Sequence, residues 1–183
     1  MIRVKCDRIL EVINKSKGEL LMNINLNVLS PFQRELDEKI CEKHNIDSSK
    51  TINERILAFL VELGELANET RCFKYWSFKN ASKRTVILEE YVDGIHFLVS
   101  LGNELDLDLQ FNFERINTPL TRQFIDVFSF AGTLQENFNE NNLRELFTKY
   151  LMLGEKLGFN QEDIIAGYQE KNKVNHQRQE ENY

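Results

Sequence analysis

Residues 83–104 read KRTVILEEYVDGIHFLVSLGNE. The apolar side chains of this stretch recur every three or four residues, which is the period of one helix face: Ile87, Tyr91, Ile95 and Leu98. The whole chain has only two prolines and eight glycines, which indicates few turns and long elements. We find no useful length of sequence that alternates with the period of a strand, and no hairpin signal. The sequence therefore predicts an all-α protein.

Helix-start signals divide the rest of the chain. Ser30 and Thr118 each precede a proline, and Thr51 with Glu54 has the spacing of a capping box. Asn160 is expected to cap the last helix, whose first turn is acidic. Together with the apolar spacing, these signals predict a bundle of about six helices: 31–44, 52–69, 83–104, 119–138, 142–157 and 161–180. Residues 104–117 are expected to form the longest connection.

A chain of 183 residues fits one domain with a substantial core. We expect that domain to span residues 28–183 and residues 1–27 to be an N-terminal extension without an assigned role. Within the extension, residues 8–16 have the pattern of a short amphipathic helix.

A second interpretation of the N-terminus concerns translation. Lys17-Gly18-Glu19 can be encoded by a purine-rich stretch that lies a few bases before the codon of Met22. Under this hypothesis Met22 is the natural start and residues 1–21 are a translated leader. The N-terminal mass of the protein made from its native gene tests the hypothesis, and a product beginning at Met1 contradicts it.

Composition excludes several classes of function. The formal charge of −6 argues against a nucleic-acid binder, which needs a basic surface. The longest apolar run, 56–61, is far short of the roughly twenty residues that span a bilayer, and no signal peptide is recognisable. Three cysteines without CxxC spacing predict neither a disulfide framework nor a zinc site. We expect a cytoplasmic protein that binds neither nucleic acid nor membrane.

Two acidic pairs suggest the chemistry. Glu62 and Glu65 lie three positions apart within one expected helix, and Glu90 and Asp93 lie three positions apart within the next, so each pair projects from one helix face. A single pair of this kind is more often a solvated surface, but both pairs here lie among apolar neighbours. Four half-buried carboxylates repel one another unless a divalent cation compensates them. Oxygen ligands suit Mg²⁺ or Mn²⁺, so the sequence predicts a metal-dependent enzyme.

Three further segments, in order and spacing with the acidic pairs, make the chain similar to a known family. They read Gln-Arg-Glu-Leu-Asp at 33–37, Phe-Lys-Tyr-Trp-Ser at 73–77, and Lys-Asn-Lys-Val-Asn-His-Gln-Arg-Gln at 171–179. From about residue 28 to its end the chain resembles the dimeric all-α dUTPases, which belong to the MazG-like all-α nucleoside triphosphate pyrophosphohydrolases. The resemblance implies a homodimer that hydrolyses dUTP to dUMP and pyrophosphate with Mg²⁺, and often accepts dUDP.

The same resemblance implies roles for individual residues. Metal ligands would be Glu62, Glu65, Glu90 and Asp93. We expect Glu62 to position the attacking water, although the sequence does not separate it from Glu65. The remaining roles concern the substrate: Lys171 and Arg178 at the phosphates, Asn175 at the nucleotide, Gln33 at the uracil edge, Lys74 near the phosphates, Trp76 beside the deoxyribose, and Tyr183 over the substrate.

Simpler interpretations of the same residues stay open. Gln33 has the spacing of a capping-box partner for Ser30, and Trp76 would be an ordinary core aromatic. The stripe of Lys171, Asn175 and Arg178 would be a solvated helix face.

Two rival functions also stay open. One is a related pyrophosphohydrolase acting on dCTP or a modified nucleotide. The other is a non-catalytic helical protein with a binding or regulatory role, which the four intact carboxylates argue against.

Overall fold

The computed structural model describes residues 21–181. The elements follow in the order β1 (Leu21–Asn25), α2 (Leu29–His44), the 3₁₀ turn η1 (Ser48–Lys50), α3 (Ile52–Thr70), α4 (Arg84–Glu104), β2 (Gln110–Glu114), α5 (Leu120–Thr133), α6 (Glu140–Lys156) and α7 (Gln161–Glu180). The prediction of an all-α bundle with about six helices is confirmed for this part of the chain. None of these helices combines the length and apolarity needed to cross a bilayer. The helix expected at 8–16 lies outside the described residues, as do residues 1–20 of the leader in the hypothesis of a start at Met22.

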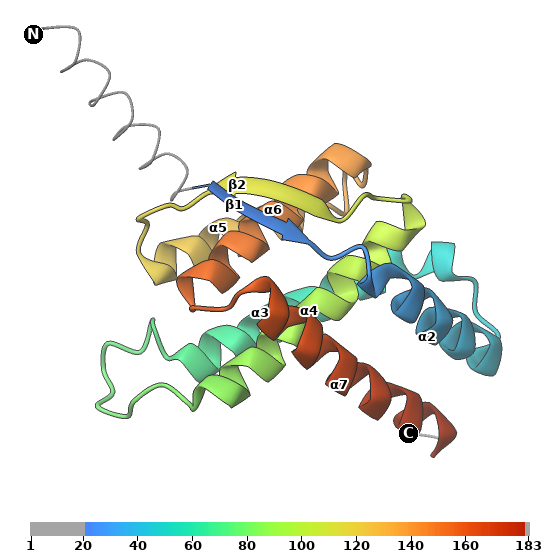
Figure 1. Ribbon diagram of the computed structural model, residues 1–183, viewed down its shortest axis with the longest axis horizontal. Coiled ribbons are helices and arrows are strands. Elements are labelled where there is room, and N and C mark those ends of the chain that lie inside the picture. The colour runs from blue at the N-terminus through green and yellow to red at the C-terminus, as the bar shows by residue number, and fades with distance from the viewer. Residues whose placement is uncertain (1–20, 182–183) are drawn as a thin grey trace, which may run out of the picture.

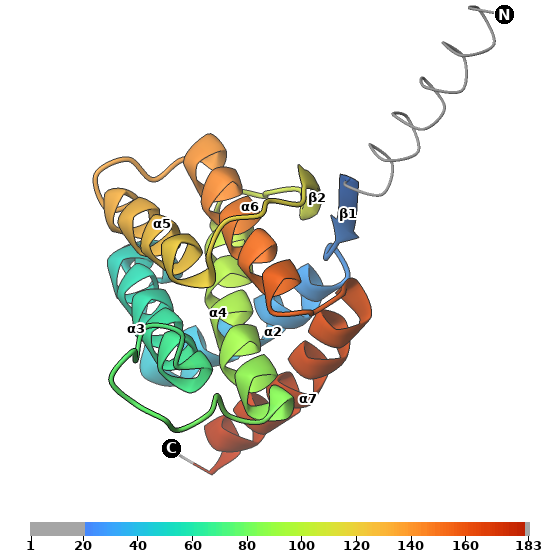
Figure 2. The same ribbon diagram turned by 90° about the vertical axis from the view of Figure 1, so that its left-hand side faces the viewer.

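Helix α4 forms the centre of the bundle (Figure 2). It packs against α2, α3, α6 and α7. Ten of its residues are buried, and they lie on nearly every side of the helix. A helix that is apolar around its circumference is stable only when other elements cover it from several directions. The site residues of α4 are therefore held on the most constrained element of the fold.

Two tyrosines join α4 to α6 in the core. The rings of Tyr91 and Tyr150 stack with centroids 4.6 Å apart. Each hydroxyl donates a hydrogen bond to the other residue's backbone carbonyl, at 3.2 Å from Tyr91 and 2.8 Å from Tyr150. Gly94 and Gly154 make room for the two hydroxyls, because a Cβ at either position would lie 2.3 Å from the opposing oxygen. These reciprocal hydrogen bonds fix the distance between α4 and α6.

A short strand pair, which the sequence analysis did not predict, closes one side of the molecule (Figure 1). Strand β1 pairs antiparallel with β2, with Met22 opposite Phe113. Buried side chains alternate along β2, and Phe111 packs against Phe147 of α6 with ring centroids 4.6 Å apart. The expectation that 104–117 is only a connection was therefore wrong. The alternation of buried and exposed side chains in β2 is short, and the strand β1 with which it pairs lies more than eighty residues earlier in the chain.

Some of the predicted helix caps are present in the structure and others are not. Asn160 caps α7 and forms a capping box with Asp163, as expected. The boxes expected at Ser30 and Thr51 were wrong, because α2 begins at Leu29 and neither hydroxyl caps a helix. The hydroxyl of Ser30 instead donates to Asn103 Oδ1 at 2.6 Å, and that of Thr51 donates to a backbone carbonyl of η1. The Ser30 hydroxyl thus joins α2 to α4, whereas the Thr51 hydroxyl makes a local bond in the turn that precedes α3.

Candidate active site

A cavity of about 400 Å³ lies between α2, α3, α4 and α7. Its volume is in the range of small-molecule sites. Six of the residues predicted from the sequence line it: Gln33, Glu62, Asp93, Lys171, Asn175 and Arg178. Residues from four separate helices thus meet at one cavity, as the prediction required.

One end of the cavity is acidic. Glu62 and Glu65 of α3 and Glu90 of α4 each offer a carboxylate oxygen, and the three oxygens lie within 4.8 Å of one another. Asp93 is not part of this closest group, and its Oδ2 accepts a hydrogen bond from Lys171 Nζ at 2.6 Å. The two acidic pairs are nevertheless neighbours, and the donor set consists of carboxylates without histidine or cysteine. Such a set fits Mg²⁺ or Mn²⁺.

The acidic end is electrostatically unfavourable by itself. Burial is the main cause that raises the pKa of Glu62 to about 7, followed by the charges of Asp93, Glu65 and Glu90, while Lys171 opposes the shift. Burial and the charge of Asp93 also raise the pKa of Glu90. Carboxylates that share a site in this way retain protons unless a cation balances them. A divalent cation bound at this cluster would relieve the repulsion among its carboxylates.

Helix α7 supplies the positive side of the cavity. Lys171 bridges two acids of α4, with Nζ at 2.6 Å from Asp93 Oδ2 and 3.2 Å from Glu89 Oε1. Asn175 and Arg178 follow on the same stripe and also line the cavity. The stripe is thus not a plain solvated face. Glu89 is mostly exposed and ion-paired, in keeping with its position off the face of the acidic pair.

The carboxamide of Gln33 is buried in the cavity wall and makes three hydrogen bonds. Its Nε2 donates to Asp37 Oδ1 at 2.8 Å. Its Oε1 accepts from the hydroxyl of Tyr168, and His96 Nδ1 lies 2.9 Å from the same oxygen. The interpretation of Gln33 as a capping-box partner was therefore wrong.

Comparison with known proteins identifies the family. A family model described as dUTPase matches residues 25–183. The chain belongs to this dUTPase family. Its activity is that of a dUTP diphosphatase, which hydrolyses dUTP, and this agrees with the enzyme predicted from the sequence over a non-catalytic binding protein. A search of curated proteins finds no match.

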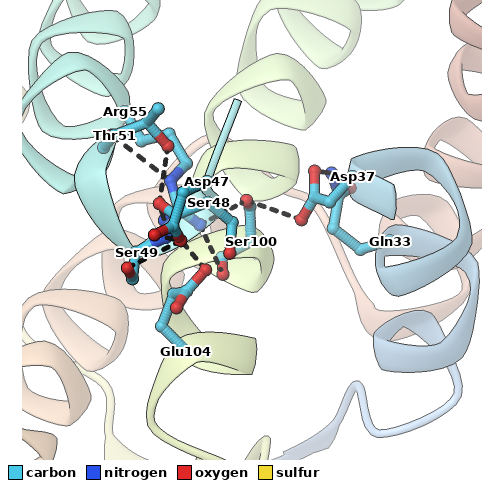
Figure 3. A network of polar contacts seen from close by, with 9 residues as sticks. All are labelled: Gln33, Asp37, Asp47, Ser48, Ser49, Thr51, Arg55, Ser100 and Glu104. Carbon is cyan, nitrogen blue, oxygen red and sulfur yellow. Dashed lines mark hydrogen bonds and ion pairs between the residues drawn. The ribbon is translucent and has the colours of Figure 1, made fainter. Parts of the chain in front are cut away.

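The sequence analysis missed a polar network on the cavity wall of this dUTPase (Figure 3). Arg55 of α3 donates to Ser100 Oγ of α4 at 3.0 Å, and Ser100 donates to Asp37 Oδ2 of α2 at 2.7 Å. The guanidinium also donates to Glu104 Oε1 at 3.0 Å and to the carbonyl of Ser48 at 2.7 Å.

One signal could have revealed this network. Asp37 lies one helix turn after Gln33, Arg55 lies two turns before Glu62, and Ser100 lies two turns after Asp93. Each member thus shares a helix face with a residue that the sequence analysis had singled out.

Two other predicted residues of the dUTPase lie apart from the cavity. Lys74 and Trp76 belong to the loop 71–83 between α3 and α4 (Figure 1) and are not among the cavity-lining residues. Trp76 is 63% exposed and contacts Phe73 and Tyr75 edge-on, so it is not a core aromatic. Lys74 donates to Asn68 Oδ1. Tyr183 lies outside the described residues.

Proposed function

We propose that this dUTPase hydrolyses dUTP to dUMP and pyrophosphate in a Mg²⁺-dependent reaction, and dUDP to dUMP and phosphate. The observation that carries the proposal is the meeting of three carboxylate oxygens within 4.8 Å of one another, beside a cavity that Lys171 and Arg178 also line. A polyphosphate approaches an acidic surface favourably only when cations lie between the two negative partners.

The metal ligands in this proposal are Glu62, Glu65, Glu90 and Asp93, and Mn²⁺ would substitute for Mg²⁺. Their carboxylate chemistry and their unfavourable proximity support the assignment. When bound, the metal would supply positive charge to the phosphates and lower the pKa of a water. Lys171 pairs with Asp93 and Glu89 in this structure. With substrate bound, it would be able to pair with a phosphate oxygen as well.

Glu62 is proposed to position the water that attacks a phosphate. It lines the cavity, whereas Glu65 does not, which favours Glu62 of the two carboxylates on α3. Its carboxylate can accept a hydrogen bond from the water and orient it toward phosphorus.

Substrate binding is proposed to use both walls of the cavity. Lys171 and Arg178 would bind the phosphates, with the planar guanidinium suited to bidentate contact. Asn175 would contact the nucleotide and Gln33 the uracil edge. Three further contacts rest on the resemblance: Lys74 near the phosphates, Trp76 beside the deoxyribose, and Tyr183 over the substrate.

The remaining proposals concern the whole protein. We propose a homodimer, supported by exposed apolar side chains on the neighbouring helices α3 and α5: Leu57, Val61 and Ile125. We further propose residues 28–183 as a single domain, residues 1–27 as an extension, and a cytoplasmic location without nucleic-acid or membrane partners. The negative charge of the chain supports the absence of a nucleic-acid partner.

The test uses the purified full chain with Mg²⁺ and each deoxynucleoside triphosphate in turn, following pyrophosphate release. Preference for dUTP that disappears in Glu62→Gln supports the proposal, and phosphate release from dUDP supports the second substrate. Equal turnover of dUTP and dCTP would favour the related pyrophosphohydrolase. Turnover that is unchanged in EDTA would contradict the dependence on a metal.

A further inference from the structure

The carboxamide of Gln33 is held from three helices at once. Asp37 is on α2 with it, His96 is on α4, and Tyr168 is on α7. Its oxygen receives the Tyr168 hydroxyl and faces His96 Nδ1, so both of its lone pairs have a partner. Its nitrogen donates one hydrogen to Asp37. Among the contacts of residues 21–181, the second hydrogen of this nitrogen has no acceptor.

The carboxylate of Asp37 determines which way the amide points. An ionised carboxylate only accepts hydrogen bonds, so the nitrogen of Gln33, and not its oxygen, must face it. Burial raises the pKa of Asp37, while the hydrogen bonds from Ser100 and Gln33 and the charge of Arg55 oppose this rise and favour the ionised form. With the nitrogen fixed toward Asp37, the oxygen is turned toward His96 and Tyr168. Burial keeps His96 neutral, and its single N–H then serves as the second donor to that oxygen.

This orientation has a consequence for the base. Gln33 lines the cavity, and its amide oxygen already has two partners, so the second N–H is the part of the amide that remains for a bound base. Uracil carries a carbonyl acceptor at C4, where cytosine carries an amino donor. An N–H donor satisfies the first and leaves the second unpaired, and an unpaired buried polar group is costly. A Gln33 free to rotate its amide would lose this discrimination.

We propose that Asp37, His96 and Tyr168 are positioning residues that lock the Gln33 carboxamide with its N–H toward the substrate, so that the dUTPase selects a base with a C4 carbonyl over cytosine. The proposal rests on the proposed contact between Gln33 and the base, and extends it to residues that act on the base through Gln33. It also gives the Arg55–Ser100–Asp37 network a role in selectivity.

The first test is Asp37→Asn in the full chain. Asparagine offers either a donor or an acceptor to Gln33, so the amide is released while the shape of the side chain is kept. We expect the ratio of kcat/KM for dUTP over dCTP to fall roughly tenfold. This factor corresponds to the free energy of one hydrogen bond to a charged group. The change should lie mainly in KM. The ratio for dUTP over dTTP should stay constant, because thymine has the same C4 carbonyl as uracil.

The second test is Tyr168→Phe, which removes one donor to the amide oxygen but keeps the ring stacked on His96. We expect the dUTP-over-dCTP ratio to fall by about threefold, as for a neutral hydrogen bond. Tyr91→Phe is the matched control, because it removes a buried hydroxyl that bonds to the backbone carbonyl of Tyr150 and is not among the partners of Gln33. The dUTP-over-dCTP ratio of Tyr91→Phe should equal that of the wild type. Thermal unfolding of each variant shows that the proteins compared are folded.

The outcomes separate the two proposals. A wild type that prefers dUTP, with variants at Asp37 and Tyr168 that keep the same ratio, overturns only this inference. Equal loss of dUTP, dCTP and dTTP turnover also overturns it, because that result indicates a merely structural role. A wild type without metal-dependent dUTP turnover overturns the proposed function and this inference with it. If Asp37→Asn does not fold, the comparison of Tyr168→Phe with Tyr91→Phe decides.

Discussion

The two ends of the cavity differ in how far their charges are balanced. At the acidic end, Glu62, Glu65 and Glu90 face one another, and burial with mutual repulsion raises the pKa of Glu62 to about 7. At the other end, Arg55 is paired with Glu104. It also donates a hydrogen bond to Ser100, which in turn donates one to Asp37. In the proposed function a cation balances the first end, whereas at the second end the guanidinium of Arg55 already faces Glu104 and Asp37. We infer that chemistry belongs to the first end and recognition to the second.

The largest expected effect is at the acidic end. Glu62→Gln keeps the size of the side chain but removes its charge, so we expect kcat for dUTP to fall about a thousandfold. Glu89→Gln is the matched control, because Glu89 is on the same side of the bundle but mostly exposed and paired with Lys171. Its kcat should stay within about threefold of the wild type. Pyrophosphate release measures both, and a Glu62→Gln enzyme within tenfold of wild type would contradict the distinction between the two ends.

The next effect is on stability and comes from the balanced end. Arg55→Met leaves Glu104 and the Asp37–Ser100 pair without their cation in a part of the structure where the Arg55 side chain is only 12% exposed. We expect the free energy of unfolding to fall by about 3 kcal/mol, as when one partner of a buried ion pair is removed. Urea denaturation measures the loss. Arg122→Met breaks an exposed ion pair with Asp126 and should cost less than about 0.5 kcal/mol. Equal losses would show that the network does not stabilise the wall.

A smaller effect follows from the buried His96. Burial, with a contribution from the charge of Lys171, lowers the pKa of His96 in the folded protein to about 3. The unfolded chain, with an ordinary histidine pKa of about 6.5, binds the proton more readily between these values, so stability falls as pH falls below about 6.5. Through this histidine, lowering the pH from 7 to 5 should reduce the free energy of unfolding by about 2 kcal/mol.

The measurement compares urea denaturation of wild type and His96→Asn at both pH values in EDTA. Carboxylates whose folded pKa is raised, such as Glu62 and Asp37, act in the opposite direction and are common to both proteins. The difference in unfolding free energy between wild type and variant should therefore change by about 2 kcal/mol, to the disadvantage of wild type at pH 5. A difference that is constant with pH would mean that His96 is not buried as described.

The sequence predicted the acidic end better than the balanced end, for a physical reason. Glu62 with Glu65, and Glu90 with Asp93, are local pairs whose spacing within one helix fixes their common face. The network at the other end joins α2, α3 and α4, so its members become partners only after the helices have packed. A sequence without an alignment shows which residues share a face, but it does not show which faces meet.

The same reasoning applies to the fold. Helix α4 was predicted because its apolar residues recur with the period of a helix, and α7 because Asn160 is an N-cap residue followed by an acidic first turn. Strands β1 and β2 were missed because their pairing connects distant segments. Ser30 misled the start of α2 because its hydroxyl bonds to Asn103 of α4, whereas α3 begins at Ile52 as predicted although the Thr51 hydroxyl does not cap it. Local patterns were thus predictable where no tertiary contact competes for the same groups.

The most direct test of the central claim is the effect of Mg²⁺ on thermal unfolding of the wild type, Glu90→Gln and Asp37→Asn without substrate. A cation that binds the acidic end of the folded chain at several times its dissociation constant adds about 1 kcal/mol, which raises the melting temperature by roughly 2–4 °C. We predict that rise for the wild type and for Asp37→Asn, and its loss in Glu90→Gln. A rise of the same size in Glu90→Gln, or none in the wild type, would contradict the assignment of the acidic end to a metal.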